Sequence, residues 1–203
     1  MNMPETHTEQ KSQIIVSCGI LKNEIELILA GNKEQTATRF LDSSLHNDLD
    51  KLSRTLTTAL EKEGEETRKL VIYGTCHPQI DEIVNASNAI RTQGQNCVEL
   101  LLGRQRFTEE LSKGAFFLFE DWARRWEQIS YRFFGNWELM KEIFQDSHTY
   151  ILCIRTPCSG DYSEYASRVS ERTGLPLVWE DFDLSRLESV ITQSLSELSL
   201  VPD

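Results

Sequence analysis

The sequence predicts an α/β fold: a doubly wound, mainly parallel sheet with helices on both faces (Rossmann-like), built as one unit or as two lobes. Short apolar runs rich in β-branched residues alternate with segments of helical apolar spacing along nearly the whole chain. This alternation is typical of parallel sheets, whose strands are joined by helices. The length of 203 residues suits one domain of this kind, with or without a small appendage.

The first third of the chain contains two strand–helix pairs. Residues 12–20 (SQIIVSCGI) are a β-branched apolar run, which predicts a buried strand, and residues 21–30 (LKNEIELILA) have apolar residues at helical spacing. Residues 36–42 (TATRFLD) predict a second strand. Residues 43–66 predict one long helix, capped by Ser43 or Ser44. Its apolar face is formed by Leu45, Leu49, Leu52, Leu56 and Leu60.

The middle of the chain contains the clearest strand, residues 69–75 (KLVIYGT). Residues 79–94 (QIDEIVNASNAIRTQG) predict one helix that ends at its final glycine. The pattern of residues 97–103 (CVELLLG) is compatible with the end of a strand or the start of a helix. Residues 106–114 (RFTEELSKG) predict a helix.

The last part repeats the same alternation. Residues 115–120 predict a strand, and residues 121–146 predict one helix or two, broken near Gly135. The remaining segments predict a strand, a helix, a strand and a final helix, at residues 149–156, 161–175, 176–181 and 183–198. The aromatic belt from Phe116 to Trp137 is typical of a protein core, but it is also dense enough to wall a pocket or form a homo-oligomer interface.

Three segments follow from this pattern. Residues 1–12 have low apolar content and predict a disordered N-terminal lead. Residues 13–145 form an α/β lobe that contains the candidate metal ligands described below. Residues 146–203 form a second α/β portion of the same domain.

Composition excludes several classes of partner. The formal net charge is −11 and the pI is about 4.9, which argues against binding to nucleic-acid phosphates or to an anionic membrane surface. No apolar run reaches the length of a membrane span, and the first residues do not resemble a secretory signal. Five cysteines without a CxxC pair indicate a cytoplasmic chain with reduced thiols.

Four residues with sulfur or imidazole donors map to loops that could converge on one edge of the predicted sheet. Cys18 ends the first strand, Cys76 follows the strand 69–75, and Cys97 follows a glycine-bounded loop. His46 follows the second strand. Because the carboxyl ends of parallel strands share one edge of a sheet, we expect these four side chains to converge there. Three thiolates and an imidazole form a known ligand set for zinc, and thiolates also hold iron–sulfur clusters.

Each of these residues also has a plainer interpretation, because a cysteine usually packs as a small apolar side chain. Cys153 lies within a predicted strand, so we expect it to be buried and outside any site. His77 is a ligand, a general base or a solvated loop residue, and the last fits its loop position best. Cys158 is compatible with a loop thiol or a site residue. Glu24 is compatible with a group that orients a ligand, or with a solvated helix residue.

Five motifs carry a family resemblance: CGILKNE, LDSSLHN, VIYGTC, NCVELLLG and GAFFLFEDW. In this order and at these spacings they resemble the family catalogued as domain of unknown function 1638, found in anaerobic bacteria and methanogenic archaea. The resemblance is good over residues 14–129 and fainter through 161–175 and 183–191. The family pattern marks Cys18, His46, Cys76 and Cys97. The chain departs from it at Gln95 and Asn96, where the family has a His-Asp pair, which puts a proton-transfer role there in doubt.

The resemblance implies a shared site and a link to corrinoid-dependent methyl transfer. The donor types predict zinc or an iron–sulfur cluster as the cofactor, with a corrinoid as a further option. The implied partners are a small-molecule or cofactor ligand and a corrinoid protein or methyltransferase.

Three hypotheses about function follow, and the sequence leaves open whether the protein is an enzyme. The first is a metal- or cluster-binding protein of anaerobic one-carbon metabolism. The second is an enzyme on a small molecule with one cysteine as nucleophile and His77 or His46 as its base. The third is a non-catalytic accessory protein with packed cysteines.

Overall fold

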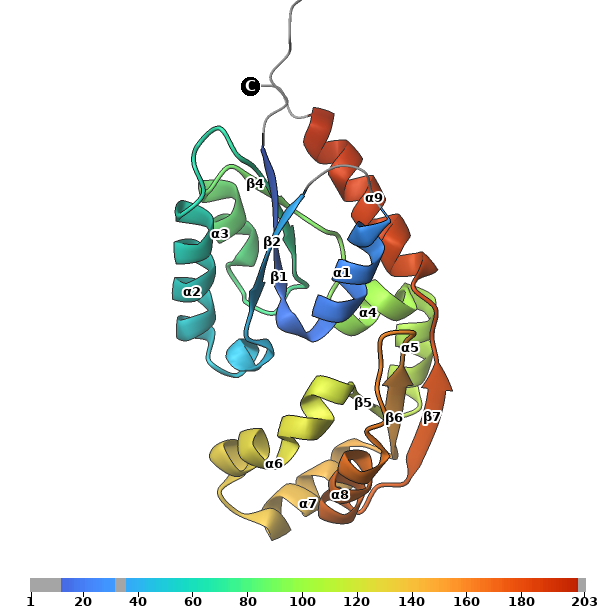
Figure 1. The fold of residues 1–203 in the computed structure, drawn as a ribbon. Helices are drawn as coiled ribbons and strands as arrows, with labels where there is room; N and C mark the ends of the chain where they lie inside the picture. The colour runs from blue at the N-terminus through green and yellow to red at the C-terminus, as the bar shows by residue number, and fades with distance from the viewer. Residues whose placement is uncertain (1–11, 32–35, 201–203) are drawn as a thin grey trace, which may run out of the picture.

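The structure is a computed structural model, and it describes residues 12–31 and 36–200. The predicted lead lies outside the described residues, except for Ser12. A first, four-stranded parallel sheet has the order β2-β1-β3-β4 (Figure 1). Its strands are β1 (Gln13–Cys18), β2 (Ala37–Leu41), β3 (Arg68–Ile72) and β4 (Ala89–Arg91).

A second, three-stranded parallel sheet has the order β5-β6-β7. Its strands are β5 (Ala115–Leu118), β6 (Tyr150–Arg155) and β7 (Leu177–Asp181). The α/β class and the parallel pairing are therefore as predicted, in a two-lobed form. The division between the sheets falls between β4 and β5, whereas the sequence placed it at residues 145 and 146.

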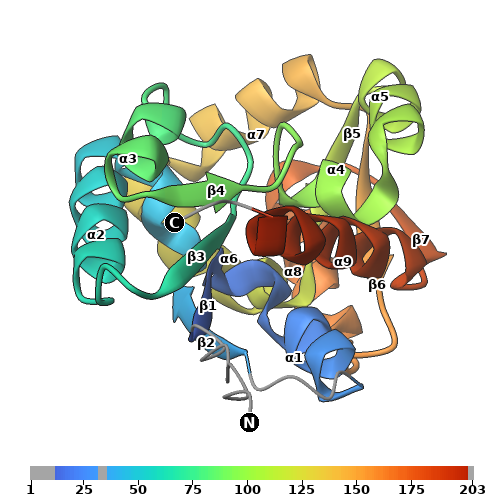
Figure 2. The same ribbon diagram turned by 90° about the horizontal axis from the view of Figure 1, so that it is seen from above.

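Helices cover both faces of the first sheet (Figure 2). On one face lie α2 (Leu49–Glu61) and α3 (Ile80–Ala86). On the other face lie α1 (Lys22–Ala30), α4 (Cys97–Leu102) and the last helix, α9 (Ser185–Leu200). The chain therefore returns to the first lobe after it completes the second.

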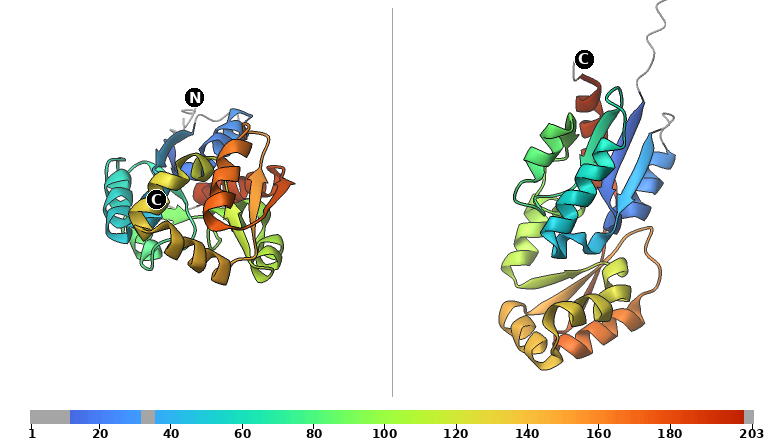
Figure 3. Two further views of the ribbon diagram at one scale, coloured as in Figure 1. Left: turned by 90° about the horizontal axis from the view of Figure 1, so that it is seen from below. Right: turned by 90° about the vertical axis from the view of Figure 1, so that its left-hand side faces the viewer.

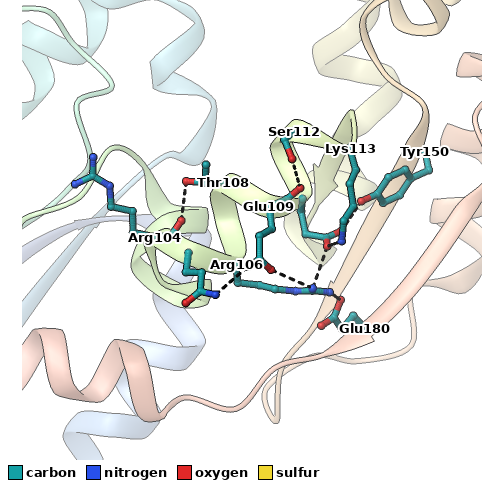
Figure 4. Close-up of polar contacts among 10 residues, drawn as sticks. Arg104, Arg106, Thr108, Glu109, Ser112, Lys113, Tyr150 and Glu180 are labelled. Carbon is teal, nitrogen blue, oxygen red and sulfur yellow. Dashed lines mark hydrogen bonds and ion pairs between the residues drawn. The ribbon is translucent and has the colours of Figure 1, made fainter.

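The second sheet is also covered on both faces. Helices α6 (Glu120–Phe134), α7 (Trp137–Ser147) and α8 (Ser163–Thr173) pack on one face. Helix α5 (Arg104–Ser112) contacts β5 on the other. A polar network fixes α5 to the strands, because Arg106 pairs with Glu180 at 2.6 Å (Figure 4). The buried Glu110 also accepts hydrogen bonds from Lys113 and from Tyr150 of β6.

The two lobes share a hydrophobic core. One cluster of buried residues contains Ile15 and Leu70 from the first sheet and Leu152 from the second, joined by residues of α4, α5 and α9. Two separate clusters fill the outer faces, one under α2 and α3 and one under α6, α7 and α8. The lobes are stacked end to end (Figure 3), with the carboxyl ends of both sheets facing the boundary between them (Figure 1).

Two predicted elements differ from the structure. The helix predicted over 43–66 is broken at Asp48, whose extended backbone separates a 3₁₀ helix, Ser43–Asn47, from α2. Asp48 caps α2, in place of the predicted serine. The helix predicted over 79–94 ends at Ala86, because Asn88 adopts a positive φ of 50° and the chain then forms β4. Residues 97–103, for which the pattern allowed a strand or a helix, form helix α4 as far as Leu102. Within the described residues, no helix has the length and apolar content needed to cross a membrane.

Candidate metal centre

Each strand of the first sheet is followed by one of the four predicted ligands. Cys18 ends β1, His46 follows β2, Cys76 follows β3, and Cys97 follows β4. Because the strands are parallel, all four segments leave the sheet at its carboxyl edge. The four side chains line one cavity of about 20 Å³. That volume is close to the space that one water molecule needs.

Two glycines let these segments approach one another. A Cβ on Gly74 would lie 2.3 Å from the Cα of Asn96 and from the carbonyl oxygen of Gln95. The segment that follows β3 therefore contacts the segment before Cys97, and the backbone N–H of Thr75 donates to the Gln95 carbonyl at 2.7 Å. On the other side of β1, a Cβ on Gly19 would lie 2.8 Å from the Leu41 carbonyl oxygen.

The three thiols are held in their neutral form. Burial raises the pKa of Cys18 to about 12, and the charges that Cys76 and Asp121 carry when ionised add to this effect. Burial also raises the pKa of Cys97 and of Cys76, with Cys18 and Cys76 contributing at Cys97. These directions indicate that the thiols are close together and lack a nearby positive charge large enough to stabilise their thiolates.

His46 lies against the second lobe. Its ring stacks on Trp122 of α6 with the ring centres 4.8 Å apart and the planes 8° from parallel. Burial lowers the pKa of His46, although a hydrogen bond to the Ser43 backbone acts in the opposite direction. The imidazole is therefore neutral near pH 7. A neutral ring with one nitrogen bonded to backbone resembles the histidines that bind metals in proteins.

Polar contacts between the lobes hold the segment that carries His46. Arg125 of α6 donates to both carboxylate oxygens of Asp42, at 2.9 and 3.1 Å, and to the Ser43 hydroxyl at 3.1 Å. Ser43 in turn donates to Asp121. Asp42 and Ser43 line the same cavity as the predicted ligands. The second lobe thus helps to position the site.

The structure brings the four predicted ligands to one cavity, but not into coordination geometry. Among the residues that the structure describes, no group of three or more cysteine, histidine, aspartate or glutamate side chains is arranged to hold a metal ion as it stands. The donor types fit a zinc ion, and the cavity has space for one atom. Metal binding therefore remains a prediction.

Comparison with known proteins supports one assignment. Residues 40–191 match the model of the family described as Protein of unknown function (DUF1638). The chain belongs to this family. No curated protein and no solved structure matches the chain. The match includes His46, Cys76 and Cys97 but begins after Cys18, and it extends through the second sheet, where the motifs indicated only a faint resemblance.

Four other residues that the sequence singled out in this DUF1638 chain are not among those that line the cavity. His77 is buried, not solvated as its position suggested, and its Nδ1 accepts a hydrogen bond from the Gln79 backbone at 3.0 Å. Glu24 is also buried, and Thr156 of the second lobe donates to it at 2.7 Å. Cys158 lies in the turn after β6, where its backbone N–H donates to Thr156. Cys153 is fully buried in the second lobe's core.

Sequence reasoning missed three residues that contribute to the candidate site. Tyr73 lines the cavity and is 3% exposed, but an aromatic residue at the end of a strand indicates only core packing. Arg91 ties the ends of β3 and β4 together by donating to the Tyr73 carbonyl at 3.0 Å. Trp122 supports His46, whereas Phe116 and Trp126 of the same aromatic belt pack around Phe144 in the second lobe.

Cys153→Ala tests whether the site is drawn correctly. The substitution should lower the free energy of unfolding by about 1 kcal/mol, because it leaves a small cavity between apolar neighbours. It should leave metal content unchanged, since Cys153 lies in the second lobe. Chemical denaturation and elemental analysis measure the two effects. Loss of metal in this variant would show that the site is located elsewhere.

Proposed function

We propose that this DUF1638 chain binds one metal ion at the carboxyl edge of its first sheet, with Cys18, His46, Cys76 and Cys97 as ligands. One observation carries the proposal: each of the four strands delivers one sulfur or nitrogen donor to the same small cavity. Four independent packing sites for these residues would not be expected to share a cavity. Binding requires the four side chains to rotate toward a common centre and the thiols to lose their protons.

The size of the cavity favours zinc over the alternatives. A volume of about 20 Å³ suits a single ion, and sulfur and imidazole donors select zinc or iron over magnesium or calcium. An iron–sulfur cluster is several atoms across and would need a larger space. A corrinoid is larger still, so we propose that any corrinoid link runs through a partner protein.

The thiol pKa values favour metal binding over nucleophilic catalysis by a cysteine. An activated cysteine needs a depressed pKa, usually from a neighbouring cation or a helix N-terminus. The pKa of Cys18, Cys76 and Cys97 is instead raised by burial. His77 faces the start of α3 and is not among the residues that line the cavity. A divalent cation would reverse the sign of these shifts, because it stabilises thiolates directly.

We place this protein in the cytoplasm, where reduced thiols persist, and in anaerobic one-carbon or corrinoid-linked methyl metabolism. The free state of all five cysteines supports the cytoplasmic location, whereas the metabolic role rests only on what the motif resemblance implies. A zinc ion with four protein ligands would be structural, and one with an open position would be catalytic. A corrinoid protein or a methyltransferase is the partner we propose.

Metal content tests the proposed function directly. The chain, purified without oxygen, should contain about one zinc per chain by elemental analysis, with no visible absorption bands of an iron–sulfur cluster. If elemental analysis instead finds iron and sulfide in equal amounts, the bound group is an iron–sulfur cluster and not zinc. A chain that is free of metal and takes up none on reconstitution would refute the proposal.

The pH dependence of stability should have opposite signs in the two forms. In the metal-free protein the pKa of Cys18 is raised from 9.0 to about 12, so the folded state holds more protons than the unfolded state between these values. Its free energy of unfolding should therefore fall as the pH rises from 9 toward 12. In the zinc form the thiolates are ligands, so stability should instead fall as the pH is lowered and protons displace the metal.

Denaturation of both forms, below pH 9 and between pH 9 and 12, is the measurement. Cys153→Ala is the control, because burial also raises the pKa of Cys153 to about 12 without placing it near the site. This variant should flatten the slope above pH 9 by the same amount in both forms, because Cys153 titrates whether or not zinc is bound, and it should leave the difference between the two forms unchanged. Equal slopes in the two forms of the wild type would contradict the assignment of the thiols as ligands.

A further inference from the structure

The hydroxyl of Tyr73 is buried and has no hydrogen-bond partner among the residues that the structure describes. Tyr73 is 3% exposed, and it lines the same cavity as the four proposed ligands. Tyr73 and Cys18 line the cavity together, and the hydroxyl interacts with the Cys18 thiol without forming a hydrogen bond of normal geometry. A buried donor without an acceptor destabilises a folded protein, so most such groups in native structures have a partner.

Metal binding would supply the missing acceptor. A neutral thiol is a weak hydrogen-bond acceptor, whereas a thiolate carries a full negative charge and forms the stronger, charge-assisted kind of hydrogen bond. The cysteines of a zinc site are thiolates. The same hydroxyl that lacks a partner in the metal-free protein therefore lies beside an acceptor in the metal-bound form.

We propose that Tyr73 is a positioning residue of the metal centre, whose hydroxyl donates a hydrogen bond to the metal-bound thiolate of Cys18. This inference rests on the proposed function, because it requires a metal ion in the cavity. The hydrogen bond orients the sulfur of Cys18 and draws charge away from it. It thereby lowers the nucleophilicity of the sulfur and stabilises the bound metal.

The substitution Tyr73→Phe separates this role from simple packing. In the metal-free protein it removes an unpaired donor, so thermal stability should stay the same or rise. In the zinc form it removes a hydrogen bond, so stability should fall, and zinc affinity should fall about tenfold in competition with a chelating dye. A purely structural tyrosine would change the stability of both forms alike.

Tyr162→Phe is the matched control. Tyr162 is also buried, at 1% exposed, but it lies in the second lobe and its hydroxyl donates to the Ile154 carbonyl at 2.7 Å. Its replacement should lower the stability of the metal-free and zinc forms equally and leave zinc affinity unchanged. This variant therefore measures how much stability is lost when a buried tyrosine hydroxyl outside the metal site is removed.

Cobalt provides a second readout, because its sulfur-to-metal charge-transfer band reports the electron density on the thiolates. In cobalt-loaded Tyr73→Phe this band should move to lower energy than in the wild type, and Tyr162→Phe should not move it. If the wild type binds cobalt and zinc but Tyr73→Phe has the same affinity and spectrum, the inference is wrong and the proposed metal site stands. If the wild type binds neither metal, the proposed function itself fails.

Discussion

Replacing any one of Cys18, Cys76 and Cys97 by serine should remove most of the bound zinc. The affinity for zinc should be at least about a hundredfold weaker. The binding free energy of a four-ligand zinc site is roughly 10–16 kcal/mol, so one thiolate contributes about 3 kcal/mol, which corresponds to about a hundredfold. Serine keeps the size of the side chain but is a much weaker ligand. Zinc per chain after anaerobic purification, and affinity by competition with a chelating dye, measure the loss.

The matched control is Cys158→Ser, because Cys158 is a half-buried thiol that is not among the residues lining the cavity. It should keep wild-type zinc. His46→Ala should lose zinc, whereas His46→Cys should retain it, because four thiolates also form a closed zinc site. If the three serine variants and His46→Ala all keep wild-type zinc, the four residues are not ligands and the interpretation as packed cysteines stands.

The position of the candidate site could be predicted because it depends on local patterns and one general rule. The strands that precede Cys18, His46 and Cys76 are apolar runs that the sequence shows clearly, and parallel strands bring their carboxyl ends to one edge. The strand that precedes Cys97 could not be predicted. Three residues, Ala89–Arg91, are too few to show an alternating or apolar pattern, and they become a strand only by pairing with β3.

The contacts between the lobes depend on tertiary structure that no local pattern records. The stack of Trp122 on His46 and the ion pair of Arg125 with Asp42 each join residues that are 76 or more positions apart. The division into two sheets could not be predicted for the same reason, because the sequence of β5 does not specify which strand it pairs with. The unpaired hydroxyl of Tyr73 likewise becomes visible only when the surrounding side chains are in place.

Gly74→Ala should destabilise the fold and remove the metal together, although it changes no ligand. The new Cβ would lie 2.3 Å from backbone atoms of Gln95 and Asn96, and backbone cannot move aside as a flexible side chain can. The segment that carries Cys97 would be displaced from the segment that carries Cys76. Overpacking of this kind costs about 2–3 kcal/mol in the free energy of unfolding. Denaturation and zinc content measure the two effects.

A graded series of glycine variants isolates the cause. Gly64→Ala should be nearly neutral, because a Cβ there would meet nothing closer than the Thr67 hydroxyl at 3.9 Å. Gly19→Ala should be intermediate, since its Cβ would lie 2.8 Å from the Leu41 carbonyl oxygen. None of these three glycines has a positive φ, so the order measures crowding between segments and not backbone strain. If Gly74→Ala kept both stability and zinc, close contact between these two segments would not be what assembles the site.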